Sequence, residues 1–506
     1  MGAKKIIKKN QSAVRPMNNV LLLFPNQLFS RSYLMPFIKK HEINEVILVE
    51  DPVFYGDRDV SLRLNKLRLA YQYALVRQYI ANNNIDKPIE LWSYDVMKTD
   101  DKQLYQSLNA KEKVFMLDPM DHLLMSKIRE YIHTSKLVIN DSPMFLLGSN
   151  DIDEFWNAKP IRRHIQHSEF YNFVKKKLHI LEKERSFDTE NRQAYPVGNE
   201  KDLPSAPWRN KNVVPESLWK SAAEWIDHHF PKNPGKINMN ILWFVATTHI
   251  EVKAWLQRFL RDRFANFGKY QDAIVKGNNW MFHSGIAVYL NFGLITPSEV
   301  VEVVKYYYER LSPSVKKAQL PSYEGFIRQL IGWREYSRLY YVKVPVSIWR
   351  KNVFRMRRVR ELSNAWYEGK TGVPIIDDTI RDAFETGYLH HIRRLMIMSN
   401  YMTLSNIHPD NVYQWMYEFS MDSWDWVMAF NVYSMGTWSD AGFAMRKPYI
   451  SSVAYVKRMS HEPSGEWESV WQNKWNAFLA KNKEILMHTQ LASIIRAQRK
   501  PSFRIA

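Results

Sequence analysis

Two adjacent histidines, His390 and His391, stand in an apolar stretch and are followed by Arg393 and Arg394. The preceding residues predict a helix that begins near Pro374, because a proline in the first turn with aspartates close behind it is typical of a helix N-terminus. On that helix His390 would share a face with both arginines, since neighbours three and four residues apart stack. Nearby cations lower the pKa of an imidazole toward or below neutrality, which suits a general acid or base and favours an anionic or electron-rich ligand against the group. A helical metal site is disfavoured, because helical ligand pairs lie three or four residues apart and adjacent histidines diverge.

Two other stretches contain groups that could bind a ligand. His283 and Ser284 precede a helical run, where backbone N–H groups and the helix dipole favour a phosphate. An ordinary N-cap serine is the alternative there. Gln329, Trp333 and Arg334 share one segment, in which the arginine can pair with a carboxylate or phosphate and the indole offers a flat face. A core aromatic residue with a surface ion pair explains this second segment equally well.

Two further segments combine charge with aromatic rings. Residues 420–436 place Asp422 and Asn431 among aromatic side chains, and buried carboxylates and amides need partners. A ring system with several hydrogen-bonding nitrogens would supply these partners, as would a self-contained polar network. Residues 349–360 carry six basic residues interleaved with aromatic ones, which fits a nucleic-acid surface and, equally, a solvated charged segment.

The composition favours a polyanionic partner such as nucleic acid. The chain has 506 residues and a formal net charge of +19, from 71 basic against 52 acidic residues. No apolar run approaches the roughly 18 residues that a membrane span needs, so an integral membrane protein is not expected. Cysteine is absent, which excludes disulfides, thiol nucleophiles and cysteine-ligated metal or iron–sulfur sites, and fits a reducing intracellular compartment.

Strand-like and helical stretches alternate in the first part of the chain. Apolar runs that begin at residues 19, 45, 88, 112 and 136 have strand length, which predicts a Rossmann-like α/β domain with an open, mostly parallel sheet. Ligands of such sheets bind at the carboxyl ends of strands, here at Asn26 and Gln27. An ordinary polar turn fits these two residues as well, and no GxGxxG fingerprint follows the first strand.

The periodicity divides the chain into four parts. Residues 1–16 form a basic leader that we expect to be disordered, and residues 17–146 form the α/β domain. Residues 147–235 are polar and contain prolines, which indicates a connector between domains. From residue 236 to residue 506 the apolar stripe follows the helical period, which predicts an all-α domain.

Three segments, in this order, resemble signature segments of the cryptochrome/photolyase family. "FHSGIAVYLNFGLITPSEV" (282–300) is similar to the segment that wraps the flavin phosphates, and "FIRQLIGWREY" (326–336) to the Gln…Trp-Arg-Glu-aromatic motif. "GKTGVPIIDDTIRDAFETGYLHHIRR" (369–394) is similar to the segment that ends in TGxxHxxxR. "FDTENRQ", "NFGKYQDA", the paired histidines and "WDWVMAFNVYSMG" resemble the bacterial branch of prokaryotic (6-4) photolyases.

One feature departs from that branch. Its members typically hold a [4Fe–4S] cluster on four cysteines, and this chain has none, so no such cluster is expected here. The stretch where cysteines would stand reads "HEPSGEWESVWQNKW". We expect packing of Trp467, Trp471 and Trp475 to fill the space.

The resemblance implies a fold and a set of site residues. The fold is an N-terminal α/β domain of the antenna type and a C-terminal helical domain that holds FAD. The positions that match flavin contacts are Tyr270, His283, Ser284, Gln329, Arg334, Arg394, Asp422 and Asn431. His390 and His391 match the pair that donates a proton during (6-4) repair, with His391 expected to be essential. Trp333 matches the lesion-facing wall, and Trp415 and Tyr455 resemble steps of an electron route to the flavin.

The function implied is light-driven repair of (6-4) pyrimidine photoproducts. Photoexcited reduced FAD passes an electron to a lesion flipped out of UV-damaged DNA, and a monomer is expected. The basic residues expected to contact DNA are Arg355, Arg357 and Arg358. The branch often carries 6,7-dimethyl-8-ribityllumazine as antenna, for which Asn26 and Gln27 are the candidate contacts. The location expected is the cytoplasm, with the nucleoid, or the nucleus in a eukaryotic source.

Other functions fit the same sequence. A cryptochrome-like blue-light photoreceptor would keep FAD without repairing DNA, and the fold serves both functions. A light-independent nucleic-acid-binding protein with a decayed flavin site is a third hypothesis. Repair of cyclobutane dimers is a further option for an enzyme.

Overall fold

The N-terminal part is built on one parallel sheet of five strands. The computed structural model describes residues 18–82, 85–158, 164–204 and 211–497, so the predicted leader at residues 1–16 lies outside the described residues. The strand order is β3-β2-β1-β4-β5, and all pairs are parallel. The strands are β1 (Asn19–Leu23), β2 (Ile43–Val49), β3 (Ile89–Trp92), β4 (Lys113–Leu117) and β5 (Leu137–Asn140).

Each strand overlaps one of the apolar runs that predicted it, and only β2 begins before its run, by two residues. The central strand β1 is buried along its whole length, because helices cover both faces of a parallel sheet. Its register places Val20 beside Val114 of β4 and beside Glu45 of β2. The predicted α/β domain with an open parallel sheet is confirmed. The helices of this part are α1 (Arg31–Lys40), α2 (Lys66–Ala81), α3 (Tyr94–Ser107) and α4 (His122–Tyr131).

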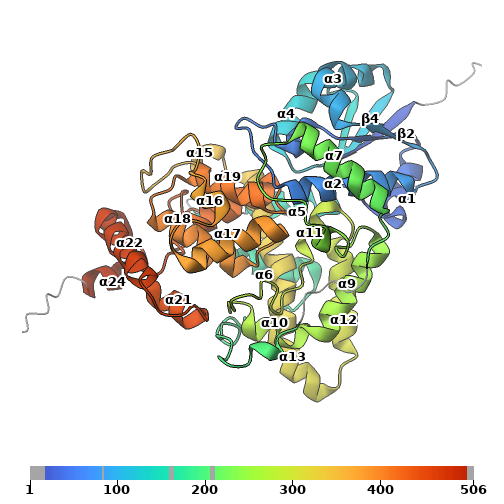
Figure 1. The fold of residues 1–506 in the computed structure, drawn as a ribbon. Coiled ribbons are helices and arrows are strands. Elements are labelled where there is room, and N and C mark those ends of the chain that lie inside the picture. Colours follow the sequence, from blue (N-terminus) through green and yellow to red (C-terminus); the bar gives the residue numbers. More distant parts are fainter. Residues whose placement is uncertain (1–17, 83–84, 159–163, 205–210, 498–506) are drawn as a thin grey trace, which may run out of the picture.

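The region predicted as a connector contains three α-helices in its described residues. Helix α7 (Glu216–His229) packs against α2, as Figure 1 shows, and buries Trp219, Ala222 and Ile226. These residues follow the spacing of one helix face, so α7 belongs to the wall of the α/β part. The other two helices are α5 (Ser149–Asn157) and α6 (His167–Leu178).

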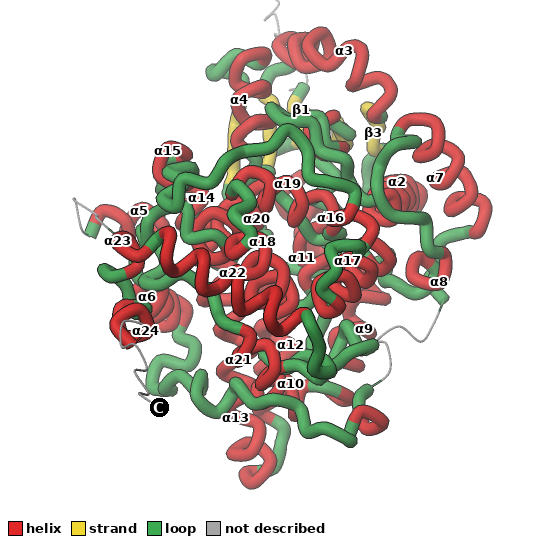
Figure 2. Tube along the Cα trace, turned by 60° about the vertical axis from the view of Figure 1, so that its left-hand side comes forward, coloured by secondary structure: helices red, strands yellow, loops and turns green. Residues whose placement is uncertain are grey.

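The rest of the described chain is helical, as predicted. Strands occupy one end of the molecule and helices the remainder (Figure 2). Local signals explain individual helix starts: α12 follows Thr296, whose side chain accepts a hydrogen bond from the backbone N–H of Glu299, and Pro297 takes the first helical position. None of the described helices is both long and apolar enough to cross a membrane.

The helices of this part are listed by their bounds. They are α8 (Met239–Leu242), α9 (His249–Asp262), α10 (Phe264–Tyr270), α11 (Ala287–Phe292), α12 (Pro297–Glu309), α13 (Pro313–Ile327), α14 (Glu335–Lys343), α15 (Val346–Trp349), α16 (Ala365–Glu368), α17 (Pro374–Thr386), α18 (Asn400–Leu404), α19 (Pro409–Phe419), α20 (Asp425–Met428), α21 (Val453–Met459), α22 (Trp467–Lys481), α23 (Lys483–Leu486) and α24 (Ala492–Ala497).

Three tryptophans of α22 lie inside the molecule. Trp467, Trp471 and Trp475 are buried, and Trp471 packs 5.0 Å from the ring of Tyr401 in α18, between ring centroids. The indole nitrogen of Trp471 donates a hydrogen bond to the backbone oxygen of Ser451 at 3.1 Å. The helix therefore attaches to the helical part through aromatic packing.

Candidate functional site

One cavity in the helical part brings together most of the predicted site residues. Its volume is about 310 Å³. The predicted residues that line it are His283, Ser284, Gln329, Trp333, Arg334, His390, His391, Arg394, Asp422 and Asn431. Residues more than 140 positions apart in the sequence thus meet at one site.

Three π-helical segments form much of the cavity wall. They are η4 (Arg328–Arg334), η5 (Arg393–Ser399) and η6 (Ala429–Gly436). Each contributes at least one predicted site residue: Arg334 from η4, Arg394 from η5 and Asn431 from η6. Such segments are rare and frequently occur at functional sites, because the extra residue per turn redirects side chains.

The paired histidines lie where a helix is interrupted. Helix α17 begins at Pro374, as predicted, but ends at Thr386, and Gly387 adopts a φ of 62°. Helical structure resumes at His391, and the backbone oxygen of His390 accepts a hydrogen bond from the N–H of Arg394 at 3.2 Å. The expectation that one continuous helix carries His390 and the arginines on one face is therefore wrong, because glycine in a left-handed conformation ends the helix.

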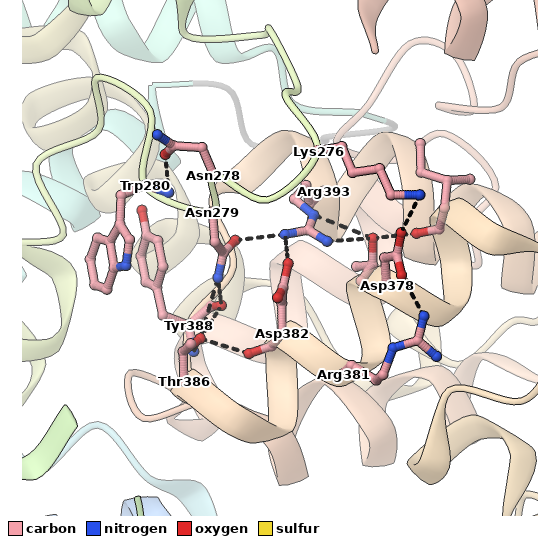
Figure 3. A network of polar contacts seen from close by, with 12 residues as sticks. Lys276, Asn278, Asn279, Trp280, Asp378, Arg381, Asp382, Thr386, Tyr388 and Arg393 are labelled. Carbon is pink, nitrogen blue, oxygen red and sulfur yellow. Dashed lines mark hydrogen bonds and ion pairs between the residues drawn. The ribbon is translucent and has the colours of Figure 1, made fainter. Parts of the chain in front are cut away.

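Arg393 belongs to a polar network of side chains that does not include the two histidines (Figure 3). Its guanidinium forms an ion pair with Asp382 and donates hydrogen bonds to Asn279 Oδ1 at 3.0 Å and to Thr379 Oγ1 at 3.0 Å. Asn279 in turn donates to the backbone oxygen of Tyr388 at 2.6 Å. The network joins α17 to the segment that leads into the cavity at Tyr388, and its carboxylate neutralises Arg393.

Arg394 faces the cavity and has a carboxylate of its own. Its Nη1 and Nη2 donate to the two oxygens of Asp422 at 2.9 and 3.3 Å, and its Nε donates to the backbone oxygen of Leu389 at 2.7 Å. Burial by itself raises the pKa of Asp422, but the pairing with Arg394 and a hydrogen bond from Ser420 bring that pKa below its usual value. Protein carboxylates thus compensate both arginines, so these cations do not themselves require an anionic ligand.

Asn291 connects Asp422 with Arg334. Its side-chain nitrogen donates to the backbone oxygen of Asp422 at 2.7 Å, and its oxygen accepts from Arg334 Nη1 at 2.6 Å. Arg334 also lies against the ring of Trp426, with 4.7 Å from the guanidinium carbon to the ring centroid, and burial lowers its pKa to about 10. Neither Asn291 nor Trp426 was predicted, since their roles arise from contacts between distant segments.

Three histidines cluster at one side of the cavity. The rings of His283 and His390 stack with centroids 4.6 Å apart, and the ring of His391 lies 5.4 Å from that of His283. Burial, together with the neighbouring cationic groups, lowers the pKa of His283 and of His390 well below the usual value. His391 is 47% exposed, and its Nε2 lies 3.3 Å from Asp272 Oδ1. Two neutral imidazoles therefore form the inner part of the cluster, and one accessible imidazole with a carboxylate partner forms the outer part.

Trp333 lines the cavity and is covered on one face by His167 of α6. The two rings stack with centroids 3.7 Å apart, and Phe430 lies 6.2 Å from Trp333. Burial and the nearby Arg328 lower the pKa of His167 to about 3. The region predicted as a connector thus supports this wall, a role that sequence reasoning missed because no local pattern marks it.

Three predicted cofactor and electron-route residues lie outside the lining of this cavity. Tyr270 packs against Tyr195 and Phe282, with ring centroids 5.0 and 5.6 Å away. Trp415 is fully buried, and its indole nitrogen donates to the backbone oxygen of Trp366 at 2.6 Å. Tyr455 is half-buried in α21.

The predicted DNA-contacting and antenna residues also lie elsewhere. The three basic residues between α15 and α16 are exposed: Arg355, Arg357 and Arg358. Asn26 and Gln27 are buried at the carboxyl end of β1, where their amides donate to the backbone oxygens of Pro119 and Leu117 at 2.9 and 3.0 Å. Their side chains thus bridge the sheet where its strand order reverses, at β1 and β4, and line neither the first cavity nor the second one described next.

A second cavity of about 320 Å³ lies between the α/β part and the helical part. Arg58 and His122 line it from the α/β side, and Trp349 and Tyr433 are among the aromatic residues of the helical side. Helix α20 separates the two cavities: Asp425 at its start lines the second, and the following residues 426–428 line the first.

Comparison with known proteins identifies the family. The family model described as "Deoxyribodipyrimidine photo-lyase-related protein" matches residues 21–241, and that described as "FAD binding domain of DNA photolyase" matches residues 326–500. The (6-4) photolyase of Agrobacterium fabrum is 32% identical over 356 residues, which cover 66% of this chain and 66% of that protein. The chain belongs to the cryptochrome/photolyase family.

Solved structures of the cryptochrome/photolyase family share its fold. The cryptochrome of Synechocystis sp. PCC6803 aligns over 95% of this chain and 90% of its own, with a TM-score of 0.57 and 14% identity. A bacterial class III photolyase from Agrobacterium tumefaciens aligns over 97% and 98%, with a TM-score of 0.54 and 13% identity. At these identities the likeness concerns the fold, which is an α/β domain followed by a helical FAD-binding domain.

The cavity fits the flavin of a cryptochrome/photolyase. Buried polar atoms with no partner among the described residues border it: Arg334 Nη2, His283 Nε2 and both ring nitrogens of His390. Buried polar groups without partners are costly, so these atoms call for a ligand that offers hydrogen-bond donors and acceptors. The ring edge and phosphates of FAD offer both, and the pair formed by Arg394 and Asp422 supplies a fixed charge arrangement beside them.

Proposed function

We propose that this protein repairs (6-4) pyrimidine photoproducts in DNA, driven by light and dependent on reduced FAD. The observation that supports the proposal is the position of His390 and His391 on the wall of the cavity that contains the Arg394–Asp422 pair. A histidine suited to meet the lesion, His391, and the residues suited to hold a flavin therefore share one site. The 32% identity to an Agrobacterium (6-4) photolyase supports the same proposal.

When bound, reduced FAD supplies the electron that light excites. His391 is the residue suited to meet the lesion, because its side chain is half exposed whereas His390 is buried. Asp272 fixes the orientation of the His391 ring through its contact with Nε2, so that the other ring nitrogen can direct a proton toward the substrate. The buried His283 and His390, both neutral, exclude water behind this group.

The substrate reaches the cavity as a damaged dinucleotide that has left the duplex. A UV lesion stacks poorly, so flipping it out of the helix costs less than flipping a normal base. Trp333 offers an aromatic wall whose outer face is already held by His167. The net charge of +19 and the exposed basic segment at residues 349–360 favour binding of the phosphate backbone.

The cavity between the two parts offers a second chromophore room that the carboxyl end of β1 does not. Asn26 and Gln27 line neither cavity, although the oxygen atoms of their amides have no partner among the described residues. Trp349 lines the second cavity, and its indole nitrogen is likewise unpartnered among the described residues. We therefore propose that an antenna such as 6,7-dimethyl-8-ribityllumazine binds there. Fluorescence of a copurified pterin-like or lumazine-like pigment that Trp349→Ala removes would support this site, and retention of the pigment in that variant would contradict it.

A photoreceptor without repair activity is the second candidate. The absence of cysteine separates this chain from repair enzymes that carry an iron–sulfur cluster, and the similar fold of a Synechocystis cryptochrome keeps a signalling role open. Such a protein would photoreduce its flavin and leave lesions unchanged.

The deciding experiment is repair of an oligonucleotide with a single (6-4) lesion. FAD-loaded, reduced protein is illuminated with blue light, and restored thymines are measured against a dark control and a duplex with a cyclobutane dimer. We expect light-dependent restoration of the (6-4) lesion, with a loss of at least about 100-fold in His391→Ala, as is typical for the removal of a general acid. Protein that binds and photoreduces FAD but restores neither lesion would refute the repair function and favour the photoreceptor. Repair of the dimer alone would refute the proposed lesion.

A further inference from the structure

The first turn of α2, from the α/β part, is inserted between two turns of the helical part. The side-chain nitrogen of Asn65, which caps α2, donates to the backbone oxygens of Phe384 and Phe419 at 3.1 Å each. Phe384 lies near the end of α17 and Phe419 at the end of α19. The two turns are joined to each other, because the N–H of Met421 donates to the oxygen of Gly387 at 2.9 Å. One helix start of the α/β part therefore braces the chain just before His390 and just before Asp422.

Arg68 extends this brace into the core. Its side chain is fully buried, and its guanidinium lies between the rings of Tyr417 and Trp424, 5.1 and 4.8 Å from their centroids. Its Nη1 donates to the backbone oxygens of Tyr417 and Ser420, both at 3.3 Å. These carbonyls belong to the last turn of α19 and its C-cap, where a cation also interacts favourably with the helix dipole.

The charge of Arg68 has no direct counterion among the described residues. No described carboxylate lies within ion-pair distance of it, and its Nε and Nη2 have no described partner. A buried cation without a partner is costly, so its field acts on whatever charge is nearest. Asp422 is one charge that this field reaches: it follows Ser420, whose backbone oxygen Arg68 binds, by two residues, and Arg68 contributes to lowering the pKa of Asp422.

We propose that Arg68 is a positioning residue of the flavin site, which holds the turn before Asp422 and places a positive charge behind the Arg394–Asp422 pair. This inference rests on the proposed use of reduced FAD and extends it to the α/β part. Added positive potential at a buried site stabilises the negative charge that reduction brings. The α/β part would thus tune the flavin without touching it.

The test compares Arg68→Met, Arg68→Lys and a control on the same helix, Arg77→Met. Arg77 pairs with Glu50 inside the α/β part, at 2.6 Å, and serves to show the effect of destabilisation alone. FAD affinity is measured by fluorescence titration, and the midpoint potential of bound FAD by equilibrium with a reference dye. We expect Arg68→Met to bind FAD about tenfold more weakly, as the removal of charge-assisted hydrogen bonds predicts, and to shift the midpoint to a more negative potential.

The lysine variant separates charge from geometry. It keeps the positive charge but lacks the planar fork that reaches two carbonyl oxygens, so we expect a midpoint near that of the unmodified protein and a reduced FAD affinity. Arg77→Met should lower the thermal stability and leave the midpoint unchanged. Folded Arg68→Met with an unchanged midpoint would overturn the inference, as would an equal shift in Arg77→Met.

A double-mutant cycle with Asp422→Asn covers the case in which Arg68→Met does not fold. If Arg68 acts through Asp422, the effect of Arg68→Lys on FAD affinity becomes much smaller when Asp422 is already asparagine. Additive effects would overturn the inference. Unmodified protein that binds no FAD would overturn the proposed function and the role of Arg68 together, whereas FAD-binding protein with insensitive Arg68 variants would overturn the role of Arg68 alone.

Discussion

The buried histidines of the cavity predict a loss of stability in mild acid. His283 and His390 are both neutral in the folded protein, because burial holds their pKa values well below 6.5. In the unfolded chain each would have a pKa near 6.5 and would bind a proton as the pH falls. The unfolded state then binds more protons than the folded state, so the free energy of unfolding falls with pH. The loss begins at the unfolded pKa and continues until the folded pKa is reached.

The size of the effect follows from the linkage relation. Below the unfolded pKa, each such histidine lowers the free energy of unfolding by about 1.4 kcal/mol per pH unit. Between pH 7.5 and 5.5 the two together therefore account for a loss of about 2.7 kcal/mol. His167, whose pKa burial lowers to about 3, adds a similar contribution that does not depend on the cavity pair.

The assay is urea denaturation followed by tryptophan fluorescence at pH 7.5 and 5.5. His390→Gln should reduce the acid loss by about 1.4 kcal/mol relative to unmodified protein, and the double variant with His283→Gln by about 2.7 kcal/mol. His133→Gln is the control, because His133 is exposed and its removal should leave the difference unchanged. A double variant whose stability falls as steeply as that of the unmodified protein would refute the assignment of neutral, buried imidazoles.

Three further outcomes are expected. Asp422→Asn leaves the buried Arg394 without a counterion and should lower the free energy of unfolding by about 3–5 kcal/mol in urea denaturation at pH 7. The difference should begin to shrink below about pH 4, where an aspartate of the unfolded chain gains its proton, and should go on shrinking toward the lower pKa of the folded Asp422 carboxyl. Gly387→Ala would place a Cβ 2.5 Å from Met421 Cγ at a φ of 62°, and calorimetry should show a lower Tm, from a strain of at least about 1–2 kcal/mol. The third outcome concerns DNA binding by Arg355, Arg357 and Arg358, which are replaced together by glutamine. The slope of log Kd against log salt for UV-damaged duplex, measured by fluorescence anisotropy, should fall by about 0.9 for each phosphate that the variant no longer neutralises. An unchanged slope would exclude these three arginines from the interface.

The architecture follows closely from sequence periodicity. Four of the five strands lie within an apolar run of strand length, and β2 begins two residues before its run, because strands buried between helices are apolar throughout. The helical part follows a 3.6-residue apolar stripe, because each helix buries one face. The end of α17 was within reach of the same reasoning: Gly387 is a C-cap signal, yet the apolar stripe beyond it suggested a continuous helix through His390.

Site residues could be predicted from the sequence only where they belong to a recognisable sequence motif. His390, Arg394 and Asp422 line one cavity, but the sequence does not indicate that Arg394 pairs with Asp422 while Arg393 pairs with Asp382. The choice depends on the direction in which each side chain leaves the interrupted helix. His167 supports Trp333 from 166 residues away, and contacts of that kind leave no periodic trace.

The three π-helical segments make the cavity sensitive to a kind of change that substitutions do not test. Each segment carries its site residues in a register wider than that of an α-helix. Deleting one residue would let the segment relax to α-helical geometry with better hydrogen bonds, while every following side chain turned by about 100°. Arg334, Arg394 and Asn431 would then leave the cavity although the helices remained. Single substitutions in these three segments should therefore disrupt the cavity far less often than deletion of a single residue.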